Sequence, residues 1–174
     1  MDIRATLENS YSKAGALQIA DYIGSDPERF RVLMDIFLFE EYRISQRSAW
    51  VVSHVADRHV FLINPYIDAM LDRMQTSNQG AIKRNTLRVF AMMELPEEYQ
   101  GRVVDVCFNI LDNPKEPIAV RVHAMQNLWN ICQKEPELIP ELKVIIEDHM
   151  ATGSAGFRNR GGKILRAMDR ILKP

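Results

Sequence analysis

The sequence predicts an all-α protein, a right-handed superhelix of stacked helix pairs, on the strength of three observations. Hydrophobic residues recur at helical spacing, and the strict alternation of a half-buried strand is absent. Proline, glycine and asparagine interrupt the chain at regular intervals. Similar residues also return every 37 positions, as Arg47, Arg84, Arg121 and Arg158 do. A chain of 174 residues with 47% hydrophobic residues can bury a sizeable core, so we expect a single helical-repeat domain over 1–174.

Helix boundaries follow from local signals along the chain. The expected helices span 3–23, 27–40, 44–58, 65–75, 80–94, 97–112, 117–133, 137–150 and 155–172. Ser25 with Glu28 resembles a capping box, and Asn64 before Pro65 is typical of a helix start. The prolines Pro114 and Pro117 mark a turn between two helices. Helices from 27 to 172 then make four pairs, with the helix 3–23 as an N-terminal cap.

Both helices of each pair carry the period. In the second helices, the position three after the arginine holds Trp50, Leu87, Ala124 and Gly161, and the position seven after it holds His54, Ala91, Leu128 and Leu165. In the first helices the columns are Leu33, Met70, Cys107 and Val144, then Met34, Leu71, Phe108 and Ile145. Such columns predict apolar stripes buried between stacked neighbours, with Leu128 and Phe108 in the core.

This pattern resembles the HEAT/ARM helical repeats. The segment from Val120-Arg121 through Ala124 to Leu128 matches the Val-Arg-x-x-Ala-x-x-x-Leu pattern of the second HEAT helix. The copies at Arg47 and Arg84 keep the arginine but hold Trp50 and Leu87 where the family has alanine. The resemblance implies that second helices line the concave side and that the arginine is a stacking device.

The four arginines, called the arginine ladder below, allow two interpretations. As a row of guanidinium groups they would bind an anionic ligand. They also share the stripe of the apolar positions, so we favour a structural role in which each pairs with a carboxylate or a helix-end carbonyl.

A polar face is expected on the second helices of the last two copies. Positions two, five and nine after the ladder arginine are expected to point away from the core. The tentative binding residues there are Arg121, His123, Gln126, Asn127, Asn130, Arg160 and Lys163. In the first two copies the equivalent positions hold Ala49, Val52, Thr86 and Val89. The polar residues form either a binding surface or an ordinary solvated helix face.

The C-terminal helix is strongly basic. Its charged residues are Arg158, Arg160, Lys163, Arg166, Arg170 and Lys173, against Asp169 alone. Such a helix can bind phosphate backbones, but cations near a helix C-terminus also suit a terminal cap. The glycines Gly161 and Gly162 are expected to allow close packing, opposite bulky residues such as Trp129.

Nothing in the sequence indicates a catalytic, metal or cofactor site. His54 and Asp57 lie one turn apart, but the apolar column of His54 favours a partly buried, hydrogen-bonded histidine. Cys107 and Cys132 match no metal spacing and suit buried free thiols, so we expect a cytoplasmic protein. No apolar run is long enough to span a membrane, and the start of the chain lacks the apolar core of a secretion signal.

Two functions remain open. The first is a non-enzymatic scaffold or adaptor that binds a protein partner through the concave and C-terminal surface. The alternative is nucleic-acid binding through the basic C-terminal helix, as in HEAT-like glycosylases of alkylated DNA. That resemblance would draw on Trp50, Trp129, Arg121, His123, Arg160 and Lys163. The net charge of −1 gives the alternative no general support.

Overall fold

A computed structural model describes residues 1–9, 11–77 and 79–172. These residues form helices and short connections, and no strand occurs among them, so the expected all-α, solenoid-like fold class is confirmed. The chain divides into two compact units, residues 1–93 and 94–174. A single domain over 1–174 stays a prediction.

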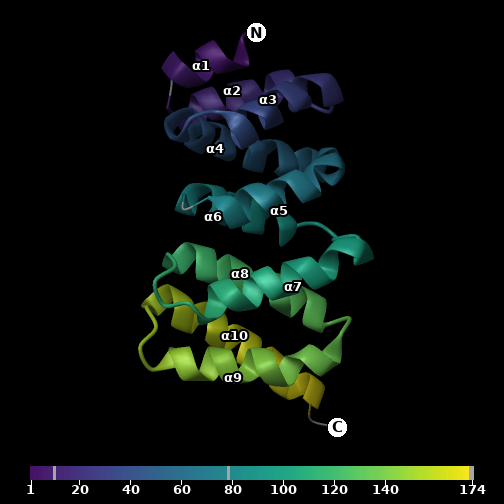
Figure 1. Ribbon diagram of the computed structural model, residues 1–174, viewed down its shortest axis with the longest axis vertical. Coiled ribbons are helices and arrows are strands. Elements are labelled where there is room, and N and C mark those ends of the chain that lie inside the picture. Colours follow the sequence, from purple (N-terminus) through teal and green to yellow (C-terminus); the bar gives the residue numbers. More distant parts are fainter. Residues whose placement is uncertain (10, 78, 173–174) are drawn as a thin grey trace. The chain divides into compact units, whose positions relative to one another are not determined.

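The first unit contains six α-helices in its described part. They are α1 (Ile3–Asn9), α2 (Lys13–Ile23), α3 (Pro27–Phe39), α4 (Tyr42–His59), α5 (Ile67–Thr76) and α6 (Gly80–Phe90). A 3-10 helix, η1 (Val60–Tyr66), leads into α5. Helix α4 packs between α2 and α6, while α3 packs against α1 and α5, so the helices stack as pairs (Figure 1).

The expected helix 3–23 is wrong as one element. Helix α1 ends at Asn9 and α2 begins at Lys13, where the Ser12 side chain accepts a hydrogen bond from the backbone N–H of Gly15. The two helices pack against each other and against the next pair. The N-terminal cap is therefore itself a helix pair, with a first helix of seven residues.

Other helix boundaries and one cap also differ from expectation; α6, for example, ends at Phe90 rather than at residue 94. Asp26, not Ser25, caps α3, because its carboxylate accepts from the N–H groups of Glu28 and Arg29. Pro65 lies inside η1, so α5 begins only at Ile67.

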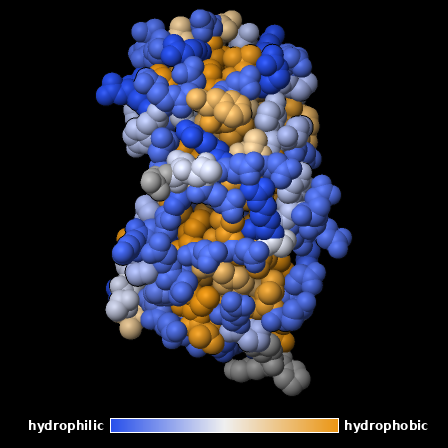
Figure 2. Space-filling model, viewed as in Figure 1, coloured by the Kyte–Doolittle hydropathy of each residue, from blue (hydrophilic) through white to orange (hydrophobic). Residues whose placement is uncertain are grey.

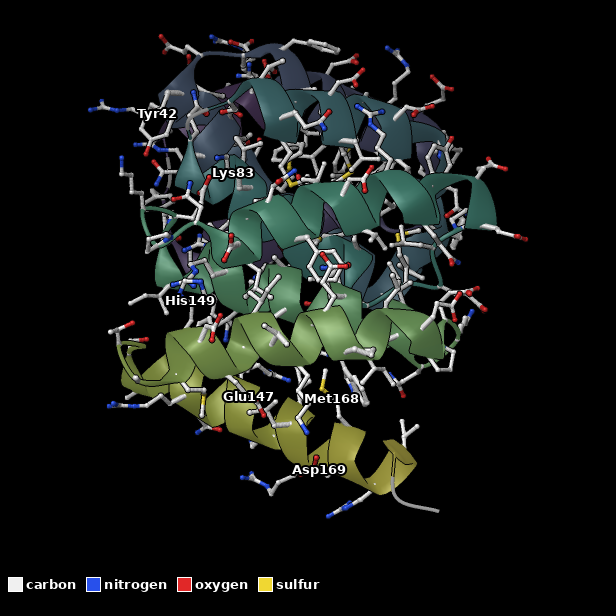
Figure 3. All side chains as sticks on the ribbon, turned by 60° about the horizontal axis from the view of Figure 1, so that its bottom comes forward. Tyr42, Lys83, Glu147, His149, Met168 and Asp169 are labelled. Carbon is white, nitrogen blue, oxygen red and sulfur yellow. The ribbon has the colours of Figure 1, made fainter. Side chains whose placement is uncertain are left out.

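The second unit contains four α-helices in its described part. They are α7 (Glu97–Asp112), α8 (Ile118–Cys132), α9 (Ile139–Met150) and α10 (Ala155–Leu172), with the short 3-10 helix η2 (Pro136–Leu138) before α9. Helix α8 packs against both α7 and α10, and α9 packs against α10. The buried Met168 lies between α9 and α10, where Lys143 of α9 also pairs with Asp169 of α10 at 3.1 Å (Figure 3).

The 37-residue period fails in the first helix of the last pair. The buried residues of α9 are Ile139, Leu142 and Ile146, each 36 positions after Val103, Val106 and Ile110 of α7. One residue rotates a helix face by about 100°. Val144, expected in a core column, is therefore 56% exposed.

Phe108 is not in the core, because the shift of one residue already occurs in α7. The buried residues of α7 lie 36 positions after those of α5: Val103, Val106 and Ile110 follow Ile67, Met70 and Met74. Phe108 is half-buried and lines an open groove of about 510 Å³ with Val104 and Leu138. Apolar side chains are visible at the surface of this unit in Figure 2.

The second helices keep the expected register only in part. Leu87, Ala124 and Leu128 are fully buried, whereas Trp50, His54, Ala91 and Leu165 of the same columns are half-buried.

Candidate functional site

Arg121, the third ladder arginine, is a buried structural residue. It is 7% exposed, and its Nε and Nη2 donate to the carbonyl oxygen of Leu111 at 2.9 and 2.7 Å. Its guanidinium also lies 4.7 Å from the ring centroid of Phe157 in α10. Burial lowers the pKa of Arg121, while Asp112 opposes that effect. The pairing with a helix-end carbonyl is thus confirmed here.

The ladder is not uniform along the chain. Arg47 repeats the arrangement, since its Nη1 donates to the carbonyl oxygens of Leu7 and Glu8 at the end of α1. Arg84 and Arg158 are exposed instead. The structural role therefore holds for two members of the ladder.

The polar face on the second helices forms a connected chain of side chains. Arg160 of α10 donates from Nη1 to Oε1 of Gln126 in α8 at 2.7 Å. The Gln126 Nε2 in turn donates to Oδ1 of Asn130, one turn further along α8, at 2.8 Å. One exposed cation is thus oriented by two amides that are themselves half-buried.

The remaining predicted binding residues differ in exposure. His123 is half-buried and Lys163 is exposed, three residues beyond Arg160 on α10. Asn127 is buried, and its Nδ2 donates to the carbonyl oxygen of His123 at 2.9 Å. Arg121 and Asn127 therefore lie beneath the surface. We use "α8/α10 face" for the solvent-accessible remainder, His123, Gln126, Asn130, Arg160 and Lys163.

Gly161 allows α10 to approach its neighbours closely. A Cβ atom there would lie 3.0 Å from Cγ2 of Ile146 and 3.1 Å from Sδ of Met150. The expected partner Trp129 is wrong, because the side chains that crowd Gly161 come from α9 and from Met125 of α8. This packing fixes the part of α10 that carries Arg160 and Lys163.

In the first two copies, the equivalent positions are not on a surface at all. Ala49, Val52, Thr86 and Val89 are fully buried, because α4 packs between α2 and α6. The expectation that they point away from the core is wrong there. The difference between the copies is one of burial as well as polarity.

The basic C-terminal helix keeps its charge in the described part. Arg158, Arg160, Lys163, Arg166 and Arg170 are all exposed, and the one acid of α10, Asp169, pairs with Lys143. Lys173 lies outside the described residues.

His54 occupies a different setting from the one expected. It is partly buried, but its Nδ1 lies 3.8 Å from Oδ2 of Asp57, and its buried Nε2 has no hydrogen-bond partner in the described part of the chain. Burial lowers its pKa, which Asp57 partly offsets. Across residues 1–9, 11–77 and 79–172, no group of three His, Cys, Asp or Glu residues is arranged to hold a metal.

Sequence reasoning missed a polar pocket in the first unit. It measures about 220 Å³, and its lining comes from α4 and α6: Trp50, Ser53, His54, Arg84, Asn85 and Arg88. In the structure, this pocket is marked by two buried polar residues, Ser53 and Asn85, whose side chains meet at 3.1 Å. Their separation of 32 positions does not follow the period, so the repeat gave no reason to join them.

Comparison with known proteins identifies the repeat. A family model described as a HEAT repeat domain matches residues 3–168, from the first residue of α1 into α10. The comparisons with curated proteins and with solved structures found no match. Within the described residues, no helix has the length and apolar character needed to cross a membrane.

Proposed function

Because the chain belongs to the HEAT repeat domain family, we propose that it is a non-enzymatic scaffold that binds a protein partner through the α8/α10 face. Stacked helix pairs offer an extended surface that needs no preorganised catalytic site, and this family is generally non-catalytic. Two buried free thiols, Cys107 and Cys132, support a cytoplasmic setting for this role.

The observation that carries the proposal is the link from Arg160 to Gln126 and on to Asn130. An arginine on a solvated face ordinarily samples many rotamers, and ordering it on a partner costs entropy. Here the side chain is already held in one orientation, which reduces that cost. Arginine is also enriched among the residues that dominate protein interfaces.

Charge points to an acidic surface on the partner. Arg160 and Lys163 are exposed cations on α10, with Arg166 and Arg170 further along the same helix. Complementary charge accelerates encounter and fixes register. We therefore assign the partner a carboxylate-rich patch opposite these residues.

Site-specific crosslinking tests the location of the interface. A photoreactive amino acid placed at Lys163 is expected to form an adduct with a protein in cell extract, identified by mass spectrometry. The matched control carries the same group at Lys115, an exposed lysine in the turn between α7 and α8. Absence of an adduct from position 163, or the same adduct at equal yield from position 115, contradicts the proposal.

Nucleic-acid binding is the second candidate, favoured by the exposed basic residues of α10. Phosphate contacts release counterions, so affinity for duplex DNA is expected to fall steeply with salt. A fluorescence titration at low ionic strength is the most permissive test. If no binding occurs under that condition, the candidate is eliminated.

A further inference from the structure

The pocket between α4 and α6 has the chemistry of an anion site. Its lining includes two guanidinium groups, from Arg84 and Arg88, and one imidazole, from His54. Arg84 is exposed, and Lys13 of α2 adds to the positive potential at His54. The nearby carboxylate of Asp57 is already paired with Arg88 at 2.9 Å, so it does not neutralise the positive charge of Arg84.

Arg88 is held at one nitrogen and unused at another. Its Nη2 contacts both carboxylate oxygens of Asp57, at 2.9 and 3.3 Å. Its Nη1 is buried and has no hydrogen-bond partner among the described residues. An unmade hydrogen bond at a buried donor is costly, and a charged acceptor recovers most of that cost.

His54, which also lines the pocket, has a second unused nitrogen. Its Nε2 is buried without a partner in the part of the chain that the structure describes. The side chains of His54 and Arg88 are 19% and 35% exposed, so both are partly accessible from the pocket, and each must rotate to direct its buried nitrogen toward a ligand. Neither nitrogen has a hydrogen bond to lose, although rotation of Arg88 also shifts the Nη2 that contacts Asp57.

The size and floor of the pocket restrict what can enter. The pocket volume of about 220 Å³ lies below the roughly 300–1,000 Å³ of pockets for drug-sized ligands. A small ionic group therefore fits, but a whole cofactor does not. The floor is polar, since the buried Ser53 Oγ donates to Oδ1 of Asn85. An apolar ligand would form no hydrogen bond with these polar side chains, so the pocket favours a polar ligand.

We propose that this pocket binds a phosphate oxyanion, held by Arg84 and by the unused nitrogens of Arg88 and His54. A tetrahedral oxyanion accepts from several donors at once, and a guanidinium matches it in a bidentate manner. The site lies in the first unit, whereas the α8/α10 face lies in the second, so the inference stands independently of the proposed function.

Nuclear magnetic resonance of the two tryptophan indole N–H groups tests the proposal in the whole chain. Trp50 lines the pocket, while Trp129 lies on α8 in the second unit and serves as an internal control. Titration with inorganic phosphate and with O-phospho-L-serine, at constant ionic strength, is expected to move the Trp50 signal saturably and leave Trp129 in place. Stronger binding of phosphoserine identifies a phosphate monoester as the ligand, and stronger binding of inorganic phosphate identifies the free ion.

A matched pair of variants assigns the effect to the pocket. Arg84→Gln is expected to weaken phosphate binding about tenfold, since it removes a charge-assisted contact. Arg158→Gln removes the equivalent exposed ladder arginine of the second unit and is expected to leave binding unchanged. The proposal is overturned if Trp50 shows no saturable shift at millimolar phosphate, or if both variants weaken binding equally.

Discussion

Arg121 donates two hydrogen bonds to the carbonyl oxygen of Leu111, at 2.9 and 2.7 Å, and so ties the first turn of α8 to the last turn of α7. Carbonyls in the last turn of a helix have no partner within that helix. Because the guanidinium also packs on Phe157 of α10, a single side chain joins three helices of the second unit. The family's arginine is here a helix-pairing device.

Arg121→Ala is therefore expected to lower the free energy of unfolding by about 2–4 kcal/mol, through loss of the Leu111 contacts and of packing on Phe157. Urea denaturation followed by circular dichroism measures the change. The control is Arg158→Ala, at the exposed equivalent position, with an expected change within about 0.5 kcal/mol. Equal losses in the two variants contradict the structural role of Arg121.

Leu128 and Phe108 are expected to differ in their contributions to stability. Leu128 is fully buried, so Leu128→Ala should cost about 2–5 kcal/mol. Phe108 is half-buried beside the open groove, so Phe108→Ala should cost less, about 1–2 kcal/mol, although it removes a larger side chain. A greater loss for Phe108 in the same urea titration would show that the register of α7 is wrong.

Two helical glycines are expected to respond oppositely to substitution. A Cβ at Gly101 in α7 meets no atom within 4 Å, so Gly101→Ala should stabilise the fold by about 0.5–1 kcal/mol through helix propensity. At Gly161 a larger side chain collides with Ile146 and Met150, so Gly161→Leu should destabilise by about 1–3 kcal/mol. Thermal unfolding measures both variants, and stabilisation by Gly161→Leu would contradict the close packing of α9 and α10.

Both cysteines are expected to resist thiol reagents in the folded state. Burial raises the pKa of the Cys107 thiol well above its ordinary value, and it raises the pKa of Cys132 to about 11. The thiolate is the reactive form, so at pH 8 reaction with an aromatic disulfide reagent should be far slower than for free cysteine. Addition of urea should release both thiols, and rapid reaction without urea would show that the helices around them open readily.

The helical fold could be predicted because its signals are local or recur at a nearly constant spacing. Leu87, Ala124 and Leu128 of the second helices could be placed in the core without tertiary information. Val144 could not be placed in the same way, because a shift of one residue in α9 changes which face is buried, and nothing near Val144 marks that shift. The break before Lys13 was missed because α1 is too short to show a period of its own.

The candidate sites depended on packing between helices, which is why less of them was predictable. The polar residues Gln126 and Arg160 were recognisable as types, but their contact joins positions 34 apart on two helices. Asn127 was placed with the surface residues because it follows Gln126 directly. One position rotates a helix face by about 100°, and in the structure Asn127 is buried while Gln126 is half-buried. The pocket around Arg84 and His54 depends on which donors remain unpaired, a property that exists only after folding.

The α8/α10 face is proposed to bind a protein partner. The most direct test is quantitative affinity purification with the double variant Arg160→Glu/Lys163→Glu, compared with Arg158→Glu/Lys115→Glu, which makes the same change in charge at exposed residues outside that face. If the α8/α10 face is the binding site, a protein captured by the wild type is lost from the first variant and retained by the second. Equal capture by both double variants would contradict this location of the binding site.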